Sequence, residues 1–393
     1  MRIISTVWAL FDYKNNNIEV LRNGGSIMIY DICEYIGRIE ESYVFIGNCR
    51  TKNDNVGSVH VLDNRKYLPP FRDVNNINQW QEGLQRRFKE LLIELKPDFV
   101  LVHGGLDFST NCIHVCMELD QPYAYVNHLG LSGNAGYKMP LREEEWERKL
   151  YSIPKINIIS VGNGMRNKIL RENKQLSISQ VHAIPNGSPL VGDKSVEYGR
   201  PDRRARNKKT LLCSGSLQPR KNQLQLVEAF RLLPDKVRNN VKVLFCGNYS
   251  EKNGYKDALI NRIESYGLKD SLQYMGVFSR DEMIDIYSSV DGLVIPSLSE
   301  GLSLVAIEMI AFGKPVIMFY DNETAGDLND NKAVILIPDH TNEALAQGIT
   351  EWYVREWDSK YIRDYSQYYN MDRVAEDYIA YINQLLHNDR VSV

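Results

Sequence analysis

Short apolar runs alternate with segments of helical periodicity along most of the chain. The runs at residues 2–10, 98–103 and 122–126 predict buried strands, each followed by a polar or Gly-rich turn. Between them, apolar residues spaced three and four apart predict helices, such as a long one over residues 77–95. Strands that alternate with helices in this way are typical of α/β folds with parallel sheets.

The same alternation restarts beyond residue 208, with predicted strands at 210–215, 241–247 and 292–295. A charged segment that contains Gly and Pro, GRPDRR at 199–204, precedes this second half and is typical of a linker. The sequence therefore predicts an α/β protein with two doubly wound domains. We place them at residues 1–190 and 209–370, with a linker at 191–208 and a C-terminal helix at 371–393.

The stretch DGLVIPSLSEGLSLVAIEMIAFGKPVI, residues 291–317, carries the most informative pattern. Its first apolar run predicts a short strand that ends at Pro296, because proline cannot donate to a sheet ladder. Apolar residues then recur at helical spacing from Leu302 to Ile310, and Gly313 is expected to end that helix. The next strand begins near residue 315.

A helix that follows a strand and a tight turn presents unpaired amides to an anion. Here these are the amides of Gly301–Leu304, where we expect a phosphate to bind. Glu300 precedes them and Glu308 follows eight residues later, about 12 Å along the helix axis. Carboxylates accept hydrogen bonds from hydroxyls, so the pattern favours a ligand with two polyol rings joined by diphosphate, a nucleotide sugar.

Each carboxylate alone has a simpler explanation: Glu300 as a charge at a helix N-terminus, and Glu308 as part of a solvated face. The whole string is more specific, because it resembles the Glu-x7-Glu signature of retaining glycosyltransferases of family 4, usually written around EGFGLxxxE. Ser303 stands where that family has its second Gly. The resemblance implies that Glu300 faces the donor sugar and Glu308 the ribose. We expect the helix start between them to bind the donor through Gly301, Leu302, Ser303 and Leu304.

Two other segments of the second half resemble the same family. Residues 215–222, GSLQPRKN, are similar to its GRLxxxKG segment, which implies that Lys221 binds the donor diphosphate. Ser216 stands where an Arg is usual, so Arg220 either replaces that charge or points away. The segment GVFS at 276–279 is similar to the GxVS loop, and Val277 and Phe278 would then contact the nucleobase through backbone groups.

The first half carries weaker patterns at predicted strand ends. Gly24 and Gly25 precede a helix and would let the backbone approach a bulky ligand, although a plain loop is the alternative. His103 and His128 fall at the C-terminal ends of predicted strands, at the edge where α/β sheets bind ligands; a buried hydrogen-bonded role is the alternative for both. The resemblance implies that Gly24 and Gly25 approach the diphosphate and that His128 contacts the donor sugar. The Gly-containing segment 130–140 is predicted to be a lid or an acceptor-binding loop.

Composition narrows the class of protein. The chain has 393 residues, 43% of them apolar and 25% charged, and a net charge of −3, which gives no reason to expect that it binds nucleic acid.

The six cysteines of the chain lack metal or redox spacing, and Cys112 and Cys116, one helical turn apart, are predicted core residues. The start lacks a cleavage-site pattern, and no apolar run approaches about 18 residues. We expect a reduced, cytoplasmic protein, and leave open peripheral contact with the inner membrane face and the oligomeric state.

Taken together, the resemblance implies a GT-B fold, in which two Rossmann-like domains face each other across a cleft and a C-terminal helix crosses back to the first. It implies retaining transfer of a hexosyl or N-acetylhexosaminyl unit from a nucleotide-diphosphate sugar, UDP-linked rather than GDP-linked, to a hydroxyl of a glycan, lipid-linked or other acceptor. Glu300, Lys221 and His128 would be catalytic. No cofactor is expected and no Asp-x-Asp metal motif occurs, so the transfer would be metal-independent.

Two alternatives remain at this point. A nucleotide-sugar epimerase or a phosphorylase could share the same architecture. A catalytically weak relative that binds a partner protein is the second alternative, and the departures at Ser216 and Ser303 favour it.

Overall fold

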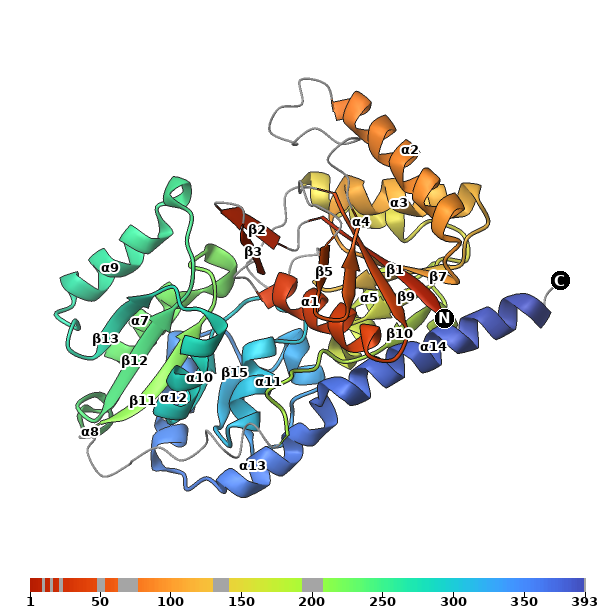
Figure 1. Cartoon of the computed structure of the whole chain (residues 1–393). Coiled ribbons are helices and arrows are strands. Elements are labelled where there is room, and N and C mark those ends of the chain that lie inside the picture. The colour runs from red at the N-terminus through yellow and green to blue at the C-terminus, as the bar shows by residue number, and fades with distance from the viewer. Residues whose placement is uncertain are drawn as a thin grey trace. The chain divides into compact units, whose positions relative to one another are not determined.

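The computed structural model describes residues 1–8, 11–14, 17–20, 24–47, 54–62, 77–129, 141–192 and 208–391 (Figure 1). The chain divides into two compact units. The first contains the described residues up to Gly187 together with the C-terminal helix from Met371, and the second runs from Ser188 to Asn370. The predicted lid at 130–140 and the predicted linker, apart from its ends, lie outside the described residues.

The first unit is built on an eight-stranded sheet in the order β10-β9-β8-β7-β1-β4-β6-β5. The central strand β1 (Arg2–Val7) pairs in parallel with β4 (Glu41–Ile46) on one side and β7 (Phe99–His103) on the other. The other strands are β5 (Asp54–Val56), β6 (Val59–Val61), β8 (Tyr123–Asn127), β9 (Ile158–Ser160) and β10 (Val181–Ala183). Only β5, in a hairpin with β6, runs antiparallel among these described strands. The strand order reverses between β1 and β7, which makes their C-terminal ends the expected ligand edge.

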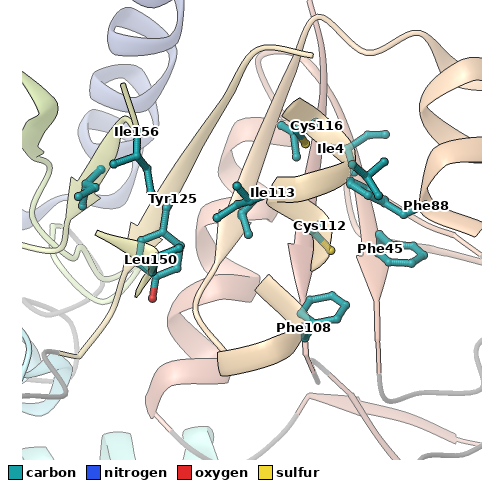
Figure 2. Packing of buried hydrophobic residues seen from close by; sticks show 14 of the residues in the cluster. Ile4, Phe45, Phe88, Phe108, Cys112, Ile113, Cys116, Tyr125, Leu150 and Ile156 are labelled. Carbon is teal, nitrogen blue, oxygen red and sulfur yellow. The ribbon is translucent and has the colours of Figure 1, made fainter. Parts of the chain in front are cut away.

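The helices of the first unit are α1 (Gly24–Gly37), α2 (Ile77–Leu95), α3 (Leu106–Glu118), α4 (Leu141–Leu150), α5 (Asn163–Glu172) and α14 (Met371–Val391). Apolar residues of α2, α3 and α4 pack on the sheet in one cluster, in which Phe88 and Phe108 lie against Phe45 (Figure 2). Cys112 and Cys116 are buried in this cluster, which confirms their predicted place in the core. Helix α14 packs on α1, so the C-terminal helix returns to the first unit as expected.

One sequence-based expectation in this unit is wrong. The residues after the first strand, where the sequence predicted a polar turn, contain a β-hairpin of β2 (Phe11–Lys14) and β3 (Asn17–Val20). The polar, Asn-rich composition concealed it, because neither strand is long enough to show a clear alternation. The first strand is also shorter than predicted and ends at Val7.

The second unit is built on a six-stranded parallel sheet in the order β13-β12-β11-β14-β15-β16. The strands are β11 (Lys209–Ser214), β12 (Val241–Cys246), β13 (Leu272–Gly276), β14 (Gly292–Ile295), β15 (Val316–Phe319) and β16 (Val334–Ile337). The helices are α7 (Gln223–Arg231), α8 (Asp235–Arg238), α9 (Tyr255–Ser265), α10 (Arg280–Ser289), α11 (Leu304–Ala311), α12 (Asn342–Val354) and α13 (Ser359–Ser366). This is the doubly wound order, with its reversal between β11 and β14.

Close backbone packing fixes the central strands of this sheet. A Cβ on Gly247, just after β12, would lie 2.1 Å from the carbonyl oxygen of Gly215, just after β11. A Cβ on Gly292 would lie 2.4 Å from the indole nitrogen of Trp352 on α12. Gly313 has a φ of 69° and ends the helix before β15, as its position in the sequence predicted. None of the described helices is both long and apolar enough to cross a membrane.

Candidate functional site

The two most informative sequence motifs meet at the topological switch point of the second sheet. Residues 215–222 follow β11, and residues 297–303 follow the adjacent strand β14. In open α/β sheets, ligands bind beyond the C-terminal strand ends at this point. The backbone also joins the two loops, because the amide of Leu298 donates to the carbonyl oxygen of Arg220 at 2.9 Å.

Lys221, Arg220 and Glu300 form a cluster between these loops. Lys221 Nζ donates to Glu300 Oε1 at 2.5 Å, and Arg220 Nη1 lies 3.4 Å from Glu300 Oε2. Arg220 also donates to the carbonyl oxygen of Ser299. The neighbouring cations therefore converge on one carboxylate, which answers the question that the sequence left open: Arg220 does not point away.

Burial makes this cluster electrostatically strong, since Lys221, Arg220 and Glu300 expose only 17%, 14% and 8% of their side chains. Burial alone would raise the pKa of Glu300, but Lys221 and Arg220 outweigh it and hold that pKa below its usual value. Burial lowers the pKa of Lys221, although Glu300 opposes the shift. The cluster is thus an ionised carboxylate flanked by two cations.

A third loop, after β15, supports the Glu300 segment and was missed by the sequence analysis. Glu323 Oε2 accepts the amide of Glu300 at 2.9 Å. Thr324 Oγ1 accepts the amide of Ser303 at 3.0 Å and donates to the carbonyl oxygen of Gly301 at 3.1 Å. The available sign was a run of polar residues, DNET at 321–324, directly after a buried strand at the ligand edge.

Helix α11 begins two residues later than predicted. Ser303 is its N-cap, and its hydroxyl accepts the amide of Ala306. The expectation that all amides of Gly301–Leu304 are open is wrong for Ser303, whose amide is bonded to Thr324. Within the described part of the chain, the amides of Gly301, Leu304 and Val305 have no hydrogen-bond acceptor. The N-terminal end of α11 therefore still presents open amides, although they are not the set that the sequence predicted.

Glu308 lies inside the second unit. The alternative of a solvated helix face is wrong, because this residue is 4% exposed. Its Oε2 accepts the hydroxyl of Tyr287 at 2.7 Å, its Oε1 accepts that of Ser188 at 3.0 Å, and Arg280 Nη2 lies 3.7 Å away. Burial raises the pKa of Glu308 despite these partners.

The remaining predicted residues of this unit flank the same strand ends. Ser216 directly follows Gly215, and its carbonyl oxygen accepts the side-chain amide of Gln223. Val277 and Phe278 follow β13, and Val277 is 43% exposed. Gly276, the last residue of β13, has a φ of 101° and turns the chain towards them.

Gly24, Gly25 and His128 belong to the first unit. The two glycines form the start of α1. His128 directly follows β8, and its Nε2 lies 2.8 Å from Nδ1 of His103, at the end of β7. The alternative of a buried hydrogen-bonded role describes His103 well, since it is 0% exposed.

Comparison with known proteins shows that part of the chain matches a family model. Residues 198–369 match the family model described as glycosyl transferases group 1. The matched residues make up nearly all of the second unit, which is called the group 1 domain from here on. The chain is also similar to the D-inositol 3-phosphate glycosyltransferase of Mycobacteroides abscessus, at 30% identity over 166 residues, which are 42% of this chain and 36% of the relative. The chain spans about a third or less of the curated proteins of that description which it matches.

Solved structures extend the likeness beyond the group 1 domain. A glycosyltransferase from Rickettsia africae is similar with a TM-score of 0.75 at 15% identity, covering 98% of this chain and 99% of the other. HepE of Anabaena, solved in complex with UDP, gives a TM-score of 0.70 at 13% identity over 98% and 100% of the two chains. These matches confirm the expected GT-B fold class.

Proposed function

We propose that the chain is a glycosyltransferase that moves a hexosyl or N-acetylhexosaminyl unit from a nucleotide-diphosphate sugar to an acceptor hydroxyl. The group 1 domain supports the reaction class, and the UDP carried by the similar HepE structure supports a UDP-sugar. The observation that carries the proposal is the buried cluster of Lys221, Arg220 and Glu300 at the switch point of the second sheet.

The cluster suits a reaction in which negative charge grows on a leaving group. As the bond to the sugar breaks, charge develops on the departing diphosphate, and nearby cations in a poorly solvated site stabilise it. Lys221 and Arg220 provide two positive charges there, and the amides of Gly301, Leu304 and Val305 add oriented dipoles. We propose that these groups act without a divalent ion.

Glu300 has two tasks in this proposal. Before the donor arrives, it keeps the buried ammonium of Lys221 paired, which avoids the cost of an isolated buried charge. When phosphoryl oxygens attract Lys221, a carboxylate oxygen becomes available to accept hydrogen bonds from the sugar hydroxyls. Its lowered pKa keeps Glu300 ionised at neutral pH, as an acceptor must be.

We further propose retention of the anomeric configuration by front-face substitution, as the family resemblance implies. The departing diphosphate would take the proton of the acceptor hydroxyl, so that no carboxylate needs to act as nucleophile. Glu308 would accept the ribose hydroxyls through lone pairs that Tyr287 and Ser188 leave available, since each carboxylate oxygen can accept two hydrogen bonds. A cytoplasmic location belongs to the same proposal.

The test is to incubate the purified chain with a panel of UDP-sugars and candidate hydroxyl acceptors and to measure UDP release and product anomer. We expect UDP release to depend on the acceptor and its rate to be unchanged by EDTA. The new glycosidic bond should have the same anomeric configuration as the sugar in the donor. Glu300→Gln should lower the rate about 100-fold or more. Wild-type rates in that variant would refute the role of Glu300, and loss of activity with EDTA would refute metal independence.

The same assay separates the alternatives. A nucleotide-sugar epimerase would convert the donor without an acceptor, and a phosphorylase would require inorganic phosphate. A partner-binding relative without catalytic activity would release no UDP from any donor, even slowly by hydrolysis.

A further inference from the structure

Two histidines at the ligand edge of the first sheet form a closely packed pair. His103 Nδ1 lies 2.8 Å from His128 Nε2, and the rings are stacked with their centroids 5.1 Å apart. The strand register explains the contact, because His103 on β7 is paired with Val126 on β8. His128 lies two residues beyond Val126, and side chains two residues apart share one face of a sheet.

Both rings are neutral at physiological pH. Burial lowers the pKa of His128 to about 4, and burial together with the neighbouring ring places that of His103 well below its usual value. A neutral imidazole has one N–H donor and one bare acceptor nitrogen. The short contact therefore holds a single proton, and one ring must donate while the other accepts.

The second nitrogen of His103 decides the direction. His103 Nε2 is buried and has no hydrogen-bond partner in the part of the chain that the structure describes. If His128 were the donor, the proton of His103 would be on this nitrogen, which would leave a buried N–H without an acceptor. If His103 donates through Nδ1, the buried atom is only a bare acceptor. Orphaned buried N–H groups are the rarer defect in proteins, so the second arrangement is favoured.

We infer that His103 is a positioning residue that holds His128 in the tautomer protonated on Nδ1. The Nε2 of His128 is then occupied by the proton from His103, and its Nδ1–H is a donor for which the described residues offer no acceptor. His128 can therefore donate a hydrogen bond to a ligand oxygen, such as a sugar hydroxyl, but cannot serve as a general base. The identity of the ligand rests on the proposed function; the tautomer does not.

Nuclear magnetic resonance of the full chain labelled with 15N-histidine tests the tautomer directly. Long-range proton–nitrogen correlations distinguish a protonated Nδ1 from a protonated Nε2, and His128→Gln assigns the signals. We expect His128 to be protonated on Nδ1 between pH 6 and 8. Protonation of His128 on Nε2 in the wild-type chain would overturn the inference.

Two substitutions of His103 give a matched comparison. In His103→Asn the side-chain amide replaces the Nδ1 donor, so the tautomer of His128 should persist. In His103→Phe an aromatic ring is kept but the N–H donor of His103 is lost. The preference of His128 for protonation on Nδ1 should then disappear. An unchanged tautomer in His103→Phe would show that His103 does not set it. His114, exposed on α3, provides the control His114→Phe, in which His128 should be unaffected.

Activity then tests the consequence separately. If the chain transfers sugar, His103→Phe should lower kcat by about tenfold or more with little change in donor KM, whereas His103→Asn should retain most of the rate. Equal losses in the two variants would contradict positioning through the Nδ1 donor. If no form of the chain transfers sugar, the proposed function fails, and the resonance measurement still decides the tautomer.

Discussion

At the scale of single residues, Glu300 and Glu308 show how surroundings set the behaviour of one side-chain type. Both are buried, but Glu300 is paired with Lys221 and Arg220, whereas Glu308 has mainly hydroxyl partners. The pKa of Glu300 lies below the usual 4.5 and that of Glu308 above it. Their contributions to stability must therefore depend on pH with opposite signs.

Glutamine substitutions should reveal these signs. Glu300 stabilises the fold fully above pH 4.5 and loses this contribution as the pH falls through its lowered pKa. Glu308 binds its proton more tightly in the folded state, so it costs stability as the pH rises above 4.5. The free energy of unfolding can be measured with urea from pH 3.5 to 8. Relative to wild type, that of Glu308→Gln should increase with rising pH, and that of Glu300→Gln should decrease. Parallel pH curves for both variants would contradict the two environments.

Lys221 gives a second prediction at this scale. Lys221→Met keeps much of the side-chain length but removes the charge, so kcat should fall by about 100-fold or more if leaving-group charge is no longer stabilised. The control is Lys236→Met, which removes an exposed lysine of α8 and should leave the rate unchanged. Equal rates in the two variants would place Lys221 outside the chemistry.

At the scale of elements, the sequence predicted helix and strand identities well and helix starts less well. The apolar spacing from Leu302 was helical, but the first helical residue is Leu304, because the hydroxyl of Ser303 caps the helix. Thr324 then takes the amide of Ser303 through a contact between loops 21 residues apart. The spacing of apolar residues shows which face of a helix is buried. It does not show hydrogen bonds between loops that meet only when the strands are paired, so the sequence could not predict the contact of Thr324 with Ser303.

Thr324→Val tests this support. The substitution keeps the shape but leaves the partly buried amide of Ser303 without its acceptor and the buried carbonyl oxygen of Gly301 without its donor. The free energy of unfolding should therefore fall by about 1–3 kcal/mol. Thr350→Val on α12 is the matched control: Thr350 donates only to the carbonyl oxygen of Ala346, and the change should stay within about 0.5 kcal/mol. Similar small changes in both variants would mean that the Thr324 bridge contributes little.

At the scale of the whole molecule, the strand and helix alternation was sufficient to predict two doubly wound sheets. Lys221 and Glu300 were identified from motifs, and their direct contact follows from the adjacency of β11 and β14. Glu323 and Thr324 were missed because they follow the next strand, 23 and 24 residues beyond Glu300, and belong to no recognised motif. Residues brought together only by sheet order need the folded structure.

Ligand binding should be measurable on the intact chain. A ligand that binds the native state raises the melting temperature, with about 2.7 kcal/mol gained when its concentration is 100 times Kd. We expect UDP to raise the melting temperature by several degrees and uridine, which lacks phosphates, to have little effect. Lys221→Met should reduce the UDP shift. Equal shifts with UDP and uridine would argue against a diphosphate site at Lys221.

The return of α14 to the first unit has a consequence for synthesis on the ribosome. The second unit is complete once Asn370 has left the exit tunnel, whereas the first still lacks the helix that packs on α1. Translation usually lets the domain made first fold first. In this chain the first unit is synthesised first but can complete its packing only after the second unit. Truncation before Met371 should leave the group 1 domain complete and expose an apolar face of the first unit.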